Sequence, residues 1–73
     1  MTIGEKIKHV LDIKGMSQKE LADKTRMTEV TISRYIADSR TPNAKAIKTL
    51  CKALDISADW LLGIKEATGK KGG

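Results

Sequence analysis

Cysteine and histidine are almost absent from this chain, which holds one of each, Cys51 and His9, among 73 residues. A single cysteine excludes a disulfide within the chain and any zinc site built from four cysteines. No apolar run approaches the roughly 20 residues needed to cross a bilayer. The N-terminal segment carries Glu5 within an interrupted apolar pattern, which is not the pattern of a secretory signal. We therefore expect a cytoplasmic protein with no metal and no membrane segment.

The residue groupings of enzyme active sites are also missing. The sequence has no glycine-rich phosphate loop, no pair of carboxylates suited to a cleft and no cluster of metal ligands. Cys51 falls on the apolar stripe of a predicted helix and has no neighbouring base, so we interpret it as a small core residue. His9 falls on the side of its predicted helix opposite to Ile7 and is expected to face solvent. We expect neither catalysis nor a cofactor.

Basic residues are in excess, and the excess is concentrated in one part of the chain. Lysine and arginine number 14 against 9 acidic residues, for a net charge of +5 at pH 7. Residues 33–52 hold five basic residues and one acidic residue, whereas residues 53–64 hold two acidic residues and no basic one. A basic block of this kind suits an anionic partner such as nucleic acid. A solvated, lysine-rich surface is the alternative interpretation.

Apolar residues recur at helical spacing along the chain, and no segment favours a strand. The pattern predicts helices over about 3–14, 17–24, 28–37, 42–54 and 57–62. Ser17 and Glu20 form a capping box that opens the second helix, and Pro42 is expected in the first turn of the fourth. The other residues suited to helix ends are Gly15, Thr28, Asn43, Ser57 and Gly63. We predict an all-α domain over residues 1–64, followed by a disordered basic tail at 65–73.

The third predicted helix has an outward face with an unusual composition. At 100° per residue, Ile32, Tyr35 and Ile36 fall on the inward side. The opposite side gathers one carboxylate, one guanidinium, a small hydroxyl and a β-branched apolar residue: Glu29, Val30, Ser33 and Arg34. Arginine can bind guanine bidentately, glutamate can accept from cytosine N4, and valine can contact a thymine methyl group. This face suits the major groove of DNA, and an ordinary exposed helix face is the alternative.

The connection between the second and third helices points to the same partner. Only residues 25–27 separate them, which is the spacing of a helix-turn-helix that places its second helix in the major groove. Gln18, Thr28 and Asn43 stand at the starts of three helices. Because helix N-termini present free N–H groups and partial positive charge, these residues are suited to bind phosphate.

The chain resembles the Cro and repressor type of helix-turn-helix domain found in phages and bacteria, the lambda repressor-like family. The resemblance covers about residues 3–64. It is carried by Ser17-Gln18-x-Glu20-Leu21-Ala22, by Ile32-Ser33-Arg34-Tyr35, by Arg40-x-Pro42 and by the stretch from Leu50 to Leu62. It implies a compact five-helix fold that binds double-stranded DNA.

The resemblance also implies roles for individual residues. The residues that would lie against base edges are Glu29, Val30, Ser33 and Arg34. Those that would contact phosphates are Gln18, Thr28, Ser39, Arg40 and Asn43. A dimer contact on the final helix would involve Trp60, Leu61 and Ile64, although Trp60 is equally suited to the core. The surplus of apolar residues on this short helix independently favours a partner surface there.

The chain departs from the family pattern in two places. Arg26 stands where the family usually has a glycine, so either the backbone there is left-handed and strained or the turn differs. Ile36-Ala37-Asp38 replaces the Glu-Asn-Gly that commonly follows the tyrosine. Asp38 thus places a negative charge where phosphate contacts are expected.

These features predict a sequence-specific transcriptional regulator, a repressor of the phage or mobile-element kind that binds a pseudo-palindromic operator as a homodimer. Two alternatives keep the fold but change the function. One is an antitoxin or regulatory partner that mainly holds another protein, such as a toxin or an antagonist. The other is a protein-interaction module in which Glu29 and Arg34 are dispensable.

Overall fold

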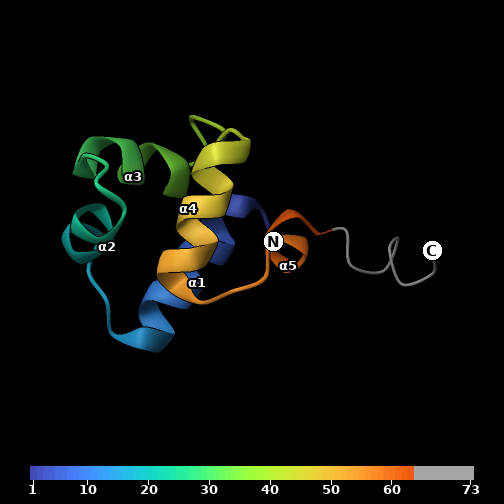
Figure 1. Cartoon of the computed structure of the whole chain (residues 1–73), viewed down its shortest axis with the longest axis horizontal. Helices are drawn as coiled ribbons and strands as arrows, with labels where there is room; N and C mark the ends of the chain where they lie inside the picture. Colours follow the sequence, from blue (N-terminus) through green and yellow to red (C-terminus); the bar gives the residue numbers. More distant parts are fainter. Residues whose placement is uncertain (64–73) are drawn as a thin grey trace.

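The computed structural model describes residues 1–63, and this part of the chain contains helices and no strands (Figure 1). The helices are α1 (Ile3–Lys14), α2 (Gln18–Thr25), α3 (Glu29–Ile36), α4 (Ala44–Leu54) and α5 (Ala58–Leu62). The predicted all-α fold is confirmed. Within residues 1–63, no helix combines the length and the apolar character needed to cross a membrane. The predicted dimer contact at Ile64 and the predicted disordered tail at 65–73 lie outside the described residues.

Each helix begins at a side chain that accepts a hydrogen bond from a free N–H of the first turn. Ser17 Oγ accepts from the N–H of Glu20, and the Glu20 carboxylate accepts from the N–H of Ser17, which confirms the predicted capping box. Thr2 and Glu5 form a second capping box at the start of α1. The three other helices begin, as expected, after the caps Thr28, Asn43 and Ser57.

The predicted place of Pro42 in the first turn of α4 is wrong by two residues. Asn43 Oδ1 accepts from the N–H of Ala46 at 2.8 Å, so Asn43 is the cap and α4 begins at Ala44. Pro42 therefore precedes the helix, and it is buried. The cap determines the start because its side chain satisfies one of the N–H groups that the first turn leaves free.

Left-handed backbone terminates four of the helices. Gly15 and Gly63, with φ of 63° and 73°, end α1 and α5 as predicted. Arg26 ends α2 with φ of 61°, and Asp55 ends α4 with φ of 57°. The left-handed turn expected at Arg26 is therefore present. Since a Cβ is disfavoured in this region, Arg26 holds a backbone conformation that glycine would adopt at lower cost.

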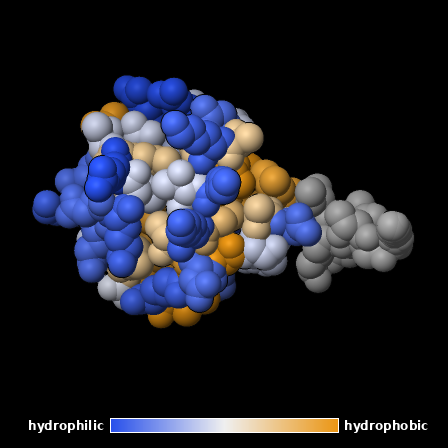
Figure 2. Space-filling model, in the orientation of Figure 1, coloured by the Kyte–Doolittle hydropathy of each residue, from blue (hydrophilic) through white to orange (hydrophobic). Residues whose placement is uncertain are grey.

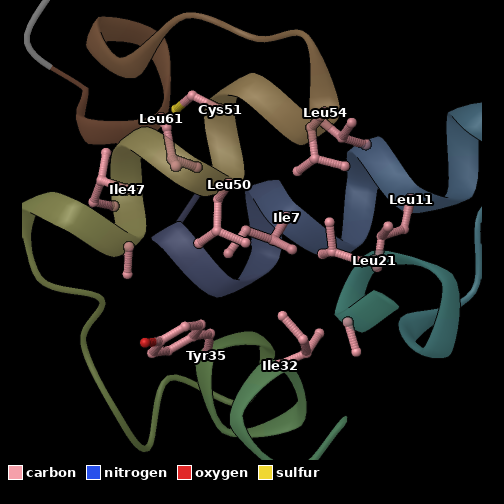
Figure 3. Packing of buried hydrophobic residues seen from close by; sticks show 13 residues of the cluster. Ile7, Leu11, Leu21, Ile32, Tyr35, Ile47, Leu50, Cys51, Leu54 and Leu61 are labelled. Atoms are coloured by element: carbon pink, nitrogen blue, oxygen red, sulfur yellow. The ribbon is translucent and has the colours of Figure 1, made fainter. Parts of the chain in front are cut away.

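The core is filled by side chains from all five helices. Figure 3 shows Ile7, Leu50 and Ile32 directed toward one centre, with Leu61 entering from α5. Helix α1 packs against α3 and α5, while α2 packs against α3 and α4. The side chains that lose all or nearly all solvent contact are Ile7, Leu21, Ile32, Leu50, Leu54 and Leu61. Each contributes about 1.5–3 kcal/mol through burial, so the position of every helix is fixed by at least one of them.

Candidate nucleic-acid interface

Helices α2 and α3 form a helix-turn-helix around residues 26–28. The turn is held by the N–H of Met27, which donates to the carbonyl of Ala22 at 3.0 Å. The buried hydroxyl of Thr25 donates to the carbonyl of Leu21 at 2.8 Å. Leu21 and Ile32 are both fully buried, so each helix holds the other in place through its inward side. This packing fixes the direction in which α3 presents its remaining side chains.

The outward face of α3 carries the residues predicted to meet DNA bases. Ile32 and Tyr35 are buried and Ile36 is half-buried, as the helical spacing predicted. The side chains left on the surface form what we call the recognition face: Glu29, Val30, Ser33 and Arg34. Val30 is 58% exposed although it is apolar. Among residues 1–63 neither Glu29 nor Arg34 takes part in a salt bridge. The fold thus makes no evident use of these side chains.

The residues predicted to meet phosphates lie at three helix starts and in the α3–α4 loop. Gln18 is the first residue of α2 and is half-buried. Thr28 caps α3, and its hydroxyl donates to the Thr31 hydroxyl at 2.9 Å while accepting from the Thr31 N–H at 3.1 Å. Asn43 uses only its carbonyl oxygen to cap α4, so its amide NH₂ stays available as a donor. Asn43 is therefore better equipped than Thr28 to donate to a phosphate.

The loop between α3 and α4 contains the other two predicted phosphate contacts. Ser39 is tied to the end of α3, since both its N–H and its hydroxyl donate to the carbonyl of Arg34, at 3.0 and 3.3 Å. Arg40 is exposed and forms no salt bridge within residues 1–63. Arg40 is thus an exposed cation in the loop that follows α3.

Asp38 has a different position from the one its sequence neighbourhood suggested. Its carboxylate accepts from the Thr2 hydroxyl at 2.5 Å and from the N–H of Gly4 at 3.0 Å, so it lies at the start of α1. Free N–H groups at a helix N-terminus stabilise such a negative charge. The Asp38 carboxylate is thus engaged by the chain itself, and its expected position near the phosphates stays a prediction.

Gly4 allows α1 to cross the end of α3 in direct backbone contact. A Cβ at this position would lie 2.3 Å from the carbonyl oxygen of Ile36 and 2.5 Å from that of Tyr35. Sequence reasoning missed the positioning residues Thr2, Gly4 and Asp38. The three-residue spacing from Thr2 to Glu5 carried a capping-box signal, and a glycine in a first helical turn carried a weak one. Together these residues fix the end of α3 and the loop that contains Arg40.

Helix α5 divides its apolar residues between the core and the surface. Leu61 is 1% exposed, so the prediction that it contacts a second copy is wrong: its side chain fills the core of its own chain. Trp60 is half-buried, and Lys6 Nζ donates to its carbonyl at 2.7 Å while lying 5.3 Å from the ring centroid. Leu62 is 43% exposed, and Ile13 of α1 is 70% exposed. Within residues 1–63, Trp60, Leu62 and Ile13 thus keep apolar surface that the core does not take up.

The single cysteine and the single histidine lie where the sequence predicted, one in the core and the other at the surface. Cys51 is buried in the core, and burial raises the pKa of its thiol. A raised pKa keeps the thiol protonated and unreactive at neutral pH. His9 is exposed and lines, with Ile13, Ile56 and Trp60, a shallow hollow of about 320 Å³ between α1 and α5. Within residues 1–63 no group of three or more potential metal ligands occurs.

Comparisons with known proteins match this geometry. A family model described as helix-turn-helix matches residues 7–61. The HTH-type transcriptional regulator ImmR of Bacillus subtilis (strain 168) is 31% identical over 70 residues, which cover 96% of this chain and 55% of ImmR. The chain thus spans about half the length of this curated relative. The solution structure of the DNA-binding domain of the P22 C2 repressor is similar with a TM-score of 0.83 at 25% identity, covering 97% of this chain and 92% of that one.

Proposed function

The chain belongs to the helix-turn-helix family, and from that premise we propose that it is a sequence-specific regulator of transcription that binds double-stranded DNA as a repressor. The observation that carries the proposal is the recognition face. Its side chains are exposed, Glu29 and Arg34 form no salt bridge within residues 1–63, and the core holds α3 from behind. The similarity to a transcriptional regulator and to a repressor's DNA-binding domain supports the same function.

Each member of the recognition face has a chemical match in the major groove. Arg34 can donate two hydrogen bonds to O6 and N7 of guanine, which is the commonest specific contact. Glu29, in the first turn of α3, can accept from cytosine N4. Ser33 can hydrogen-bond to several bases, and the exposed Val30 can contact a thymine methyl group. We assign base selection to these four residues.

The phosphate contacts would flank this face on both sides. On one side, the contacts would come from the free amide of Asn43 at the start of α4 and from Arg40 and Ser39 in the α3–α4 loop. Gln18 and Thr28 stand at the starts of α2 and α3, whose free N–H groups favour a phosphate. Contacts to the DNA backbone fix the register of the protein, and contacts to base edges then select the sequence.

Repression would follow if a dimer occupied a promoter and excluded polymerase. Two copies would place their α3 helices in half-sites about 34 Å apart, on one face of the duplex. The predicted dimer contact, now reduced to Trp60 and Ile64 with the addition of the exposed Leu62, would set that spacing. In the alternative functions, an antitoxin or an interaction module, the same surface would hold a different protein.

The experiment is selection of duplexes from a randomised pool by the purified protein near physiological salt, followed by sequencing. An enriched motif with two-fold symmetry is the expected result. A single asymmetric half-site would keep DNA recognition and contradict the dimer. Failure to enrich any sequence would contradict the proposal and favour the partner-binding alternatives.

Arg34→Ala then tests base selection directly. The substitution should cost about 1–3 kcal/mol at one base pair and relax the preference there, because it removes a bidentate contact. The measurement is affinity for the selected duplex and for duplexes altered at single positions. Arg40→Ala is the matched control, since it should weaken all duplexes alike and lower the salt dependence of log affinity by about one unit. Equal weakening on every duplex by Arg34→Ala would remove Arg34 from the recognition face.

A further inference from the structure

A basic hollow lies between α2 and α4, away from the recognition face. It has a volume of about 490 Å³. Figure 2 looks onto α4 and shows hydrophilic side chains standing around a paler floor between the two helices. The hollow, which we call the α2–α4 hollow, is lined by four cations and three small residues: Lys24, Arg26, Lys48, Lys52, Thr25, Thr49 and Ala53.

The four cations have no acidic partner in the described part of the chain. The lining contains no carboxylate, and none of the four forms a salt bridge within residues 1–63. Other surface lysines do find partners, since Lys8 lies 2.8 Å from a carboxylate oxygen of Asp12. A concave surface lined by charges of one sign focuses its field and attracts an oppositely charged partner.

Helix stability accounts for only half of this cluster. Lys24 and Lys52 lie in the last turns of α2 and α4, where a cation interacts favourably with the helix dipole. Lys48 lies in the middle of α4 and gains nothing from the dipole. Arg26 occupies a left-handed position at which glycine would cost less. Lys48 therefore stands where the helix does not require a cation, and Arg26 stands where its backbone conformation is costly for a residue with a Cβ.

The floor of the hollow is neutral and offers no platform for bases. The Thr25 hydroxyl donates to the carbonyl of Leu21 at 2.8 Å, and the Thr49 hydroxyl donates to that of Lys45 at 3.0 Å, so both are engaged within their own helices. Single-stranded nucleic acid binds to basic grooves that also present aromatic side chains for stacking, and no aromatic residue lines this hollow. A narrow neutral floor with a cationic rim suits an extended peptide that carries carboxylates at its edges.

The hollow lies at the ends of α2 and α4 opposite to their proposed phosphate contacts, Gln18 and Asn43, whereas Arg26 stands two residues before Thr28, a third proposed contact. Arg26 follows the C-terminal end of α2, whereas Gln18 begins it. Lys52 lies nine residues beyond Asn43, which corresponds to about 13 Å along α4. A duplex held at the starts of α2 and α4 would therefore leave the side of the hollow formed by α4 open to a second partner.

We propose that the α2–α4 hollow binds an acidic, extended segment of a partner protein, and that it does so while the recognition face is in contact with DNA. Glutamate or aspartate side chains of the segment would pair with Lys24, Arg26 and Lys48 at the rim. Its small side chains would rest on the methyl groups of the floor. This partner site is distinct from DNA recognition, and peptide binding to the free protein does not depend on the proposed function.

The test uses a fluorescent peptide of alternating glutamate and alanine, titrated with the whole chain and followed by anisotropy. Lys48→Glu should weaken binding by about tenfold, because it replaces a rim cation with a repelling charge. Lys14→Glu is the matched control: it makes the same change in net charge at an exposed position on α1, outside the hollow, and should change the affinity less than about twofold. Equal losses in both variants, or no binding by the unaltered protein, would overturn the proposal.

A second arm repeats the titration with the protein already bound to a DNA duplex. Retained peptide affinity is expected, since the two sites are separate. Displacement of the peptide by the duplex, together with duplex binding weakened by Lys48→Glu, would identify the hollow as a DNA surface and overturn the proposal. If the unaltered protein binds the duplex but does not bind the peptide, this proposal alone is overturned and the proposed function stands.

Discussion

Several residues in this chain hold a left-handed backbone conformation that the turn around them requires. Among residues 1–63, three non-glycine residues have positive φ: Arg26 at 61°, Asp38 at 59° and Asp55 at 57°. Aspartate enters the left-handed region more readily than most residues because its short side chain can hydrogen-bond locally. Arginine has no such advantage. The turn of the helix-turn-helix therefore carries a cost of about 1 kcal/mol that belongs to one side chain.

Arg26→Gly should relieve that cost. We expect the free energy of unfolding to rise by about 0.5–1 kcal/mol and Tm to rise by several degrees, as measured by thermal denaturation. Arg26→Ala is the control, since it removes the same cation but keeps a Cβ, and it should gain little. A Tm for the alanine variant equal to that of the glycine variant would show that charge rather than backbone strain is responsible. The glycine variant should also lose affinity for the acidic peptide, because the rim loses a cation.

At the scale of helices, the contact between α1 and α3 determines where α3 ends. Gly4 lets the two backbones meet, and Asp38 joins the loop after α3 to the first turn of α1 through Thr2 and the Gly4 N–H. The loop that holds Arg40 is thus attached to α1 as well as to α3. A change at the start of α1 is expected to move residues that the proposed function places on DNA.

Gly4→Ala tests this contact. The added methyl group would approach backbone oxygens that cannot rotate away, so the helices must separate, at a cost of about 1–3 kcal/mol. Chemical denaturation should show a lower midpoint, and affinity for the selected duplex should fall with it. Lys14→Ala, an exposed change on the same helix, is the control and should leave both nearly unaltered. An unchanged midpoint for Gly4→Ala would mean that this approach of α1 to α3 is not required.

Helix boundaries could be predicted from the sequence because their causes are local. Ser17 and Glu20 are three residues apart, and a left-handed glycine such as Gly15 acts on the turn next to it. The contact of Asp38 with Gly4 spans 34 residues, and no local pattern encodes it. The outward face of α3 followed from helical periodicity alone. The α2–α4 hollow did not, because it depends on how two helices pack against each other.

At the scale of the whole molecule, α5 directs two adjacent leucines to different places, one to the core and one to the surface. Leu61 is buried in the core, whereas Leu62 is 43% exposed, close to the half-buried Trp60. Helical geometry turns neighbouring side chains about 100° apart. Sequence reasoning recognised that this helix carries more apolar residues than it can bury, but it could not tell which of them the core would take.

Leu62→Glu should weaken dimer formation while leaving folding nearly intact, since the side chain is largely outside the core. The measurement is sedimentation of the protein with a duplex carrying both half-sites, alongside thermal denaturation. Leu61→Ala is the contrasting variant, and it should cost about 2–5 kcal/mol of stability because it empties a core position. Unchanged two-site binding by Leu62→Glu would place the dimer contact elsewhere.

The contact between α1 and α5 affects when the chain can fold during its synthesis. Lys6 Nζ donates to the Trp60 carbonyl, and Leu61 belongs to the same buried cluster as Ile7, so the first helix packs on the last described one. Domains generally fold as units while the ribosome synthesises them from the N-terminus. Helix α3 therefore leaves the ribosome before α5 is available to complete the core. A translation product that stalls ahead of α5 would contain all of α3 but would lack Leu61, which is part of the core behind it.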